Sequence, residues 1–108
     1  MTTFDEREKS FENKYQHDQE IQFKVHARRD KLVGLWAASR LGLSGAAAET
    51  YARDVVVSDL ENPSDEDLVA KILKDFQAKG VSASAAEIRK ELEHKLPIAK
   101  QQVLQAGS

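Results

Sequence analysis

Very few residues have the types and spacings that metal binding or catalysis requires. Glu91 and His94 form an E-x-x-H pair, which is the spacing used in di-iron helical bundles. Such a site needs a second pair and two more inward carboxylates, so we interpret the single pair as part of a solvated helix face. His17 and His26 are nine residues apart, which places them on opposite sides of a straight helix. We therefore expect no metal site and no catalytic residues, and an enzyme is disfavoured.

Binding of a nucleotide phosphate is a second candidate chemistry. Four basic residues lie in one short stretch: Arg28, Arg29, Lys31 and Arg40. Trp36 or Tyr51 could offer a surface on which a base stacks. The segment Gly42–Gly45 resembles a phosphate loop only faintly, because no Gly-Lys-Ser/Thr follows it. We favour a solvated basic face beside a core tryptophan, with weak ATP or ADP binding as the open alternative and no required cofactor.

Composition and charge exclude several classes of protein. The 108 residues fit a single domain, and the absence of cysteine excludes disulfides, thiolate metal sites and a cysteine nucleophile. The net charge of −2 argues against nucleic-acid binding, because neutralising phosphates requires an excess of basic residues. No apolar run approaches the roughly 20 residues of a transmembrane helix, and the polar, acidic N-terminus fits neither a signal nor a transit peptide. We expect a cytoplasmic protein, monomeric when free, that does not insert into membranes.

The longest predicted helix is the first, and it ends near Gly42. Its predicted apolar face follows helical spacing: Ile21, Val25, Arg28, Leu32 and Leu35. Upstream of this face the large apolar residues thin out to Phe4, Phe11 and Tyr15. A helix of this length is marginal in water without a packing partner. The first residues are therefore either a frayed, solvated extension of the helix or a segment that orders in a partner's groove.

Three further helices follow, separated by short loops. Turn and capping residues mark their ends: Ser44, Glu61–Pro63, Ser64 with Asp67, Gly80, and Ser84 with Glu87. Their predicted buried faces are Ala48, Tyr51, Ala52, Val55 and Val56; Leu68, Val69, Ile72, Leu73 and Phe76; and Ala85, Ile88, Leu92, Leu96, Ala99 and Val103. Pro97 inside the last helix predicts a kink or a local break. The fold class is all-α, a small four-helix bundle with a long first helix and a mobile N-terminal extension.

The stretch from Phe4 to Gly42 carries an ordered series of short motifs. They are Arg7-Glu8-Lys9, Phe11-Glu12, His17-Asp18, Phe23-Lys24, Ala27-Arg28-Arg29, Lys31-Leu32 and Gly34–Ala38. In this order they resemble the zeta-type inhibitor subunit of the F1 ATPase of alphaproteobacteria, and a looser similarity covers most of the remaining chain. Two positions depart from that pattern, since Tyr15 stands where Phe is expected and Asp30 where Asn is expected. Tyr15 keeps an aromatic anchor, whereas Asp30 lowers the positive charge beside Arg29 and is expected to weaken a contact there.

The resemblance implies an inhibitory subunit of F1FO-ATP synthase, peripheral to the inner membrane through that complex. Residues 1–18 would form an inhibitory segment, flexible when free, and residues 19–108 the helical bundle. The segment would fold into a helix in a catalytic interface between the alpha and beta subunits, stop the gamma rotor and so block ATP hydrolysis. The residues expected to contact F1 are Phe4, Arg7, Glu8, Lys9, Phe11, Glu12, Lys14 and Tyr15. The alternative functions are a small helical protein that binds or senses adenine nucleotides, and a helical adaptor for another partner.

Overall fold

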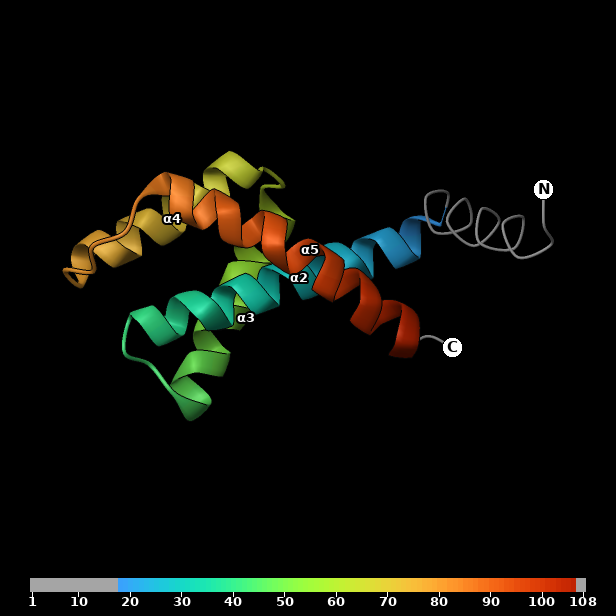
Figure 1. Cartoon of the computed structure of the whole chain (residues 1–108), viewed down its shortest axis with the longest axis horizontal. Helices are drawn as coiled ribbons and strands as arrows, with labels where there is room; N and C mark the ends of the chain where they lie inside the picture. The colour runs from blue at the N-terminus through green and yellow to red at the C-terminus, as the bar shows by residue number, and fades with distance from the viewer. Residues whose placement is uncertain (1–17, 107–108) are drawn as a thin grey trace.

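Four α-helices form the described part of the chain, residues 18–106 of the computed structural model. They are α2 (Gln19–Arg40), α3 (Gly45–Glu61), α4 (Asp65–Ala78) and α5 (Ala85–Ala106), arranged as Figure 1 shows. No strand occurs within residues 18–106. The predicted all-α four-helix bundle is confirmed. The predicted N-terminal extension lies outside the described residues, with the exception of Asp18.

Local capping explains where the later helices begin and end. The Ser64 hydroxyl oxygen accepts a hydrogen bond from the Asp67 backbone N–H at 3.3 Å, and Ser84 accepts one from Glu87 at 3.2 Å. Gly80 follows the end of α4 with a φ of +70°, a left-handed conformation that glycine adopts without a steric penalty. Ser44 precedes α3 as predicted, but its side chain makes no capping hydrogen bond.

The hydrophobic core draws residues from all four helices. Its buried members are Val33, Ala37, Val55, Leu68, Val69, Ile72, Phe76, Ile88 and Leu92. Phe76 is completely buried, and Trp36 packs edge-on against it with ring centroids 5.8 Å apart. The predicted faces of the last three helices therefore supply most of the core. Leu96 departs from the prediction, because it is 39% exposed beside the buried stripe of α5.

The buried face of α2 is rotated from the predicted one by about one residue. Its buried residues are Val25, Arg29, Asp30, Val33, Gly34, Ala37 and Ala38, whereas Arg28 is exposed and Leu32 and Leu35 are half-buried. The small residues of this face let α3 approach closely. A Cβ atom added to Gly34 would lie only 2.7 Å from Ala52 Cα. Close backbone packing, rather than large apolar side chains, therefore decides which face of α2 is buried.

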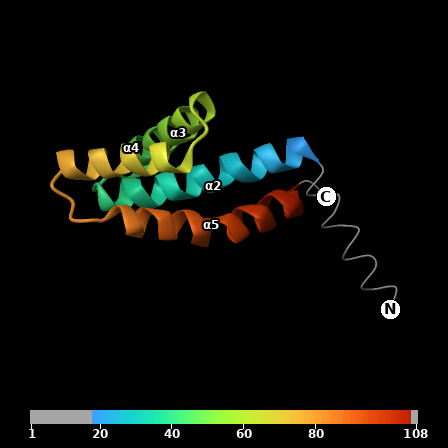
Figure 2. The same cartoon turned by 90° about the horizontal axis from the view of Figure 1, so that it is seen from above.

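The bundle has a wide end and a narrow end. Figure 2 shows α2 and α5 side by side along the molecule, with the start of α2 and the end of α5 extending beyond α3 and α4. Helix α5 continues through Pro97 without interruption, so the predicted local break is wrong. In Figure 2 its ribbon changes direction near the middle. None of the helices in residues 18–106 is both long and apolar enough to span a membrane.

Candidate functional site

The start of α2 is the point at which the predicted inhibitory segment joins the bundle. The backbone of Asp18 is extended, and its Oδ1 accepts hydrogen bonds from the backbone N–H groups of Glu20 at 3.0 Å and Ile21 at 3.2 Å. This side chain satisfies two backbone donors that a helix start leaves unpaired. The boundary predicted between residues 18 and 19 stays a prediction, because residues 1–17 lie outside the described part of the chain. No capping role for Asp18 was predicted from the sequence.

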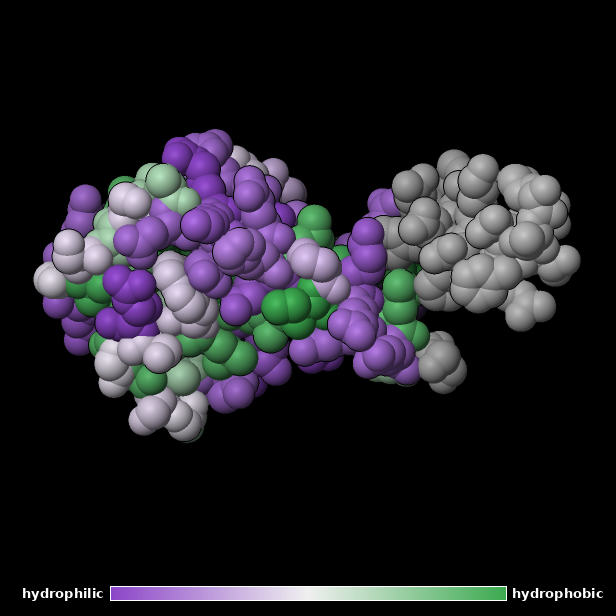
Figure 3. All heavy atoms as spheres, in the orientation of Figure 1, coloured by the Kyte–Doolittle hydropathy of each residue, from purple (hydrophilic) through white to green (hydrophobic). Residues whose placement is uncertain are grey.

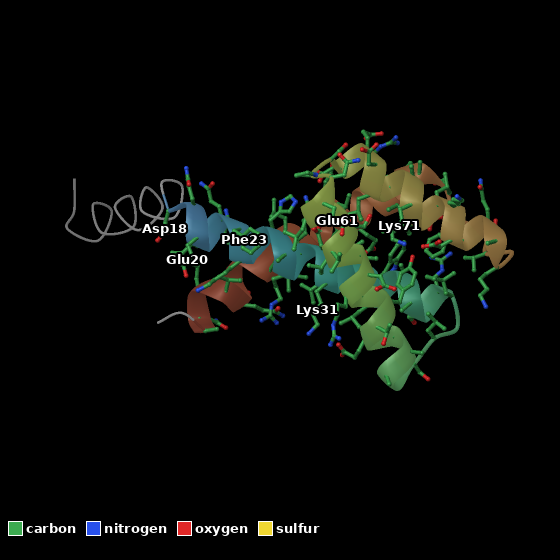
Figure 4. All side chains as sticks on the ribbon, turned by 180° about the vertical axis from the view of Figure 1, so that it is seen from behind. Asp18, Glu20, Phe23, Lys31, Glu61 and Lys71 are labelled. Atoms are coloured by element: carbon green, nitrogen blue, oxygen red, sulfur yellow. The ribbon has the colours of Figure 1, made fainter. Side chains whose placement is uncertain are left out.

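The first turns of α2 are largely exposed. Figure 4 shows Asp18, Glu20 and Phe23 along this end of the helix, with Lys31 further along it. Phe23 is 55% exposed, and Glu20 pairs with Lys24 at 3.2 Å. On the face seen in Figure 3, hydrophilic residues predominate and hydrophobic ones form small groups between them. The start of α2 is thus open to a partner, while Val25 anchors the helix in the bundle.

A group of charged side chains, here called the Arg29 cluster, ties α2 to α3 and α4. It consists of His26, Arg29 and Asp30 on α2, Asp59 on α3 and Asp65 on α4. The Arg29 guanidinium donates to both carboxylate oxygens of Asp65, at 2.8 and 3.3 Å, and to Asp30 Oδ1 at 2.9 and 3.1 Å. The His26 Nε2–H lies 2.6 Å from Asp59 Oδ2, where it can donate to the carboxylate. Three helices are therefore joined through one guanidinium and one imidazole.

Burial and mutual contacts shift the pKa values of the cluster. Burial and a hydrogen bond with Asp59 raise the pKa of Asp30 to about 8, against the opposing effect of Arg29. Burial alone would also raise the pKa of Asp59, but hydrogen bonds with Asp30 and His26 and the nearby positive charges lower it. Burial acts to lower the pKa of Arg29, yet its carboxylate partners raise it. Asp30 is a direct hydrogen-bond partner of Arg29, and its expected weakening of a contact there stays a prediction.

Part of the cluster resembles a metal site by residue type. His26, Asp59 and Asp65 can each offer one ligand atom, and these atoms lie within 4.8 Å of one another. However, Arg29 Nη2 lies 3.1 Å from His26 Nε2 and 2.8 Å from Asp65 Oδ1. The guanidinium therefore already supplies the positive charge between these ligands, and the group is an ion-pair network. In the other predicted pair, Glu91 contacts Lys95 at 3.5 Å.

The four residues predicted to meet a nucleotide do not converge on one surface. Arg29 is buried against Asp65, and Lys31 lies 3.8 Å from Glu49 of α3. The Arg40 guanidinium donates to Glu87 at 3.3 Å and lies 5.7 Å from the centre of the Trp36 ring. Arg28 is exposed. Because their partners lie on three different helices, nucleotide binding stays a prediction without support from this arrangement.

Comparison with known proteins also covers the N-terminal residues that precede α2. A family model described as ATPase inhibitor subunit zeta matches residues 1–102, so the match includes the predicted N-terminal segment as well as the helices. A solved structure described as "Solution NMR structure of the protein" is 42% identical in sequence, with a TM-score of 0.70. That similarity covers 80% of this chain and 98% of the other. No curated protein matches the chain.

Proposed function

The chain belongs to the ATPase inhibitor subunit zeta family, and from this we propose that it inhibits ATP hydrolysis by inserting residues 1–18 into F1. The segment enters a catalytic interface between an alpha and a beta subunit as a helix and prevents rotation of gamma. Phe4, Phe11 and Tyr15 act as spaced apolar anchors. The charged residues Arg7, Glu8, Lys9, Glu12 and Lys14 select the register and the partner more than they add affinity.

The capped start of α2 is the observation that carries this proposal. Asp18 caps the start of α2 at the narrow end of the molecule, away from the core around Phe76. A segment attached there can enter a partner without disturbing the core. An inhibitor of this kind needs no catalytic group of its own, and it acts where F1FO sits, on the cytoplasmic side of the inner membrane.

Folding energetics set a condition on this mechanism. Ordering a flexible segment on binding costs about 2–5 kcal/mol of the gross interaction energy. The bundle can reduce that cost by holding the base of the segment in a fixed direction. The Arg29 cluster does this for α2, because it joins the helix to Asp59 of α3 and Asp65 of α4. Because α2 is held rigidly in this way, the proposed mechanism does not require the bundle itself to dock on F1.

The test is inhibition of purified F1 from the source organism or a near relative. We expect the full chain to inhibit ATP hydrolysis with saturation near one copy per F1, and the variant lacking residues 1–18 to have no effect. Circular dichroism of the truncated variant should show a folded helical bundle, since the core lies entirely within the described helices. Inhibition by a folded truncated variant would exclude the N-terminal mechanism.

A pair of aromatic variants sharpens the test. Phe11→Ala removes a proposed anchor, and anchors of this kind contribute about 2 kcal/mol or more, equivalent to roughly 30-fold in affinity. Phe23→Ala is the matched control, because Phe23 is an exposed aromatic residue beyond the proposed segment. We expect the inhibitory concentration to rise for Phe11→Ala alone. Equal losses in both variants would show that the contact extends onto the bundle.

A further inference from the structure

Two buried carboxyl groups meet where α2 packs against α3. Asp30 on α2 is 1% exposed and Asp59 on α3 is 3% exposed. Both carboxyl groups lie against the same two side chains. Arg29 Nη2 lies 2.9 Å from Asp30 Oδ1 and 3.9 Å from Asp59 Oδ2, and His26 Nε2 lies 3.8 Å from Asp30 Oδ2 and 2.6 Å from Asp59 Oδ2. A hydrogen bond between two carboxyl groups requires a proton on one of them, because an ionised carboxylate only accepts. A proton held between Asp30 and Asp59 would join the two helices through such a bond.

The remaining oxygens of the pair indicate where that proton sits. Asp59 Oδ2 lies 2.6 Å from His26 Nε2, whereas Asp59 Oδ1 is buried and has no hydrogen-bond partner within residues 18–106. Asp30 Oδ1 accepts from Arg29, which leaves its second oxygen to carry the proton. A carboxylic acid at Asp30 would give Asp59 a donor that it otherwise lacks. Buried polar atoms are almost always paired in this way.

The other charged groups around this pair come from α2 and α4. His26 and Arg29 on α2 and Asp65 on α4 surround it. The charged side chains of α5 that have described ion pairs are engaged elsewhere: Glu87 with Arg40, Arg89 with Glu66, and Glu91 with Lys95. The cluster thus holds three carboxyl groups against one permanent positive charge. Loss of the shared proton would add a further negative charge in a buried site, which is energetically costly.

We propose that the proton shared by Asp30 and Asp59 is a pH-sensitive latch that holds α2 against α3 and is released in mildly alkaline solution. The raised pKa of Asp30, about 8, agrees with this geometry. The latch lies between Val25 and Val33 on α2, so its release loosens the half of the helix that leads to Asp18. The proposal concerns the fold of the bundle and does not depend on the proposed inhibition of F1.

The direction of the pH dependence follows from the two protonation equilibria. The unfolded chain releases the Asp30 proton near pH 3.8, whereas the folded chain keeps it until about pH 8. Between these values the folded state binds one more proton at this site than the unfolded state does. The folding equilibrium constant therefore falls by up to tenfold for each pH unit in this window. The contribution is complete below the lower pKa and is lost once the pH passes the higher one.

Denaturant unfolding of Asp30→Asn between pH 5.5 and 9.5 tests the latch. The amide keeps the shape of the carboxylic acid and a permanent donor for Asp59, but it cannot lose that proton. We expect the folding constant of the natural chain to fall relative to that of the variant by up to tenfold per unit from pH 6 to 8. The matched control is Glu61→Gln, an exposed acid on the same helix as Asp59, which should follow the natural chain. Parallel pH profiles for the natural chain and Asp30→Asn would overturn the proposal.

A direct titration does not depend on any variant folding. The carboxyl carbon resonance of Asp30 in the natural full-length chain, followed by NMR, should titrate several pH units above the usual value of about 3.9. The backbone amides of α2 around His26 should shift over the same pH range. A midpoint for Asp30 near the usual value would show that the pair does not hold a proton at neutral pH, and the latch would not exist.

Discussion

Helices α2 and α3 approach each other closely at Gly34 and Ala52. A Cβ atom built on Gly34 would lie 2.7 Å from the Ala52 Cα, 3.2 Å from its Cβ and 3.3 Å from Val55 Cβ. Because the nearest atom belongs to the backbone of α3, a side chain at position 34 cannot be accommodated by a simple rotamer change. The contact that contains the Arg29 cluster thus depends on a residue without a side chain.

We predict that Gly34→Ala destabilises the bundle. The substitution gains about 1 kcal/mol of helix propensity but forces α3 away. Because the clash is with a backbone atom, we expect an overpacking cost of about 2–3 kcal/mol, in the upper part of the usual range. A net loss of about 1–2 kcal/mol in the free energy of unfolding is expected, measured by urea denaturation. Ser39→Ala, at an exposed position of the same helix, should change that free energy by less than about 0.5 kcal/mol. A variant Gly34→Ala that is as stable as the natural chain would contradict the close packing.

The charged residues of this contact show the limit of sequence reasoning at the residue scale. The sequence predicts Arg29 on a solvated basic face and Asp30 beside it as a residue that lowers the positive charge, since charged side chains are seldom buried without partners. Their partners, Asp59 and Asp65, are about 30 positions away, and the pattern of one helix does not contain them. The only available sign was the spacing Val25, Arg29, Val33 and Ala37, which puts Arg29 in an apolar stripe.

At the scale of helices, local chemistry makes the boundaries predictable. Ser64 and Ser84 cap the helices that they precede, and Gly80 follows the end of α4, because these effects involve residues only a few positions apart. The face of α2 was predicted less well. That face is chosen by the approach of α3 to Gly34, which is a property of two helices together.

The Asp18 cap leads to a prediction about the start of α2. Asp18→Ala removes the acceptor for the Glu20 and Ile21 amides, and loss of such a cap costs about 0.5–2 kcal/mol. We expect faster hydrogen exchange of these two amides and of the first turn of α2, with little change in α3 and α4. Asp18→Asn is the control, since its side-chain oxygen can cap equally well. Unchanged exchange rates in Asp18→Ala would mean that the cap does not hold the start of the helix.

At the scale of the whole molecule, the single core implies a single unfolding transition. Phe76 on α4 contacts Trp36 on α2, and the same cluster includes Val55 of α3 and Ile88 of α5. Because each helix buries its face against the others, none is expected to remain folded once this cluster is lost. The one tryptophan of the chain reports directly on the centre of the core.

We predict that Phe76→Ala lowers the free energy of unfolding by about 3–5 kcal/mol, through lost burial and the cavity that remains. Tryptophan fluorescence and circular dichroism should give coincident denaturation curves for both the natural chain and the variant. Leu60→Ala, at an exposed apolar position on α3, should have an effect below about 0.5 kcal/mol. Separate transitions for fluorescence and helicity would show that the helices unfold in independent units.

The start of α2 and the end of α5 emerge at the same narrow end of the molecule (Figures 1 and 2). An affinity tag or fluorescent protein fused directly after α5 would therefore begin at the same end of the molecule as Asp18 and compete for space with whatever binds there. A surface-immobilised sample attached through its C-terminus would bury the same end against the support. The turn at residues 79–84 lies at the opposite end and offers a better point of attachment for a label. A probe placed there leaves the narrow end free.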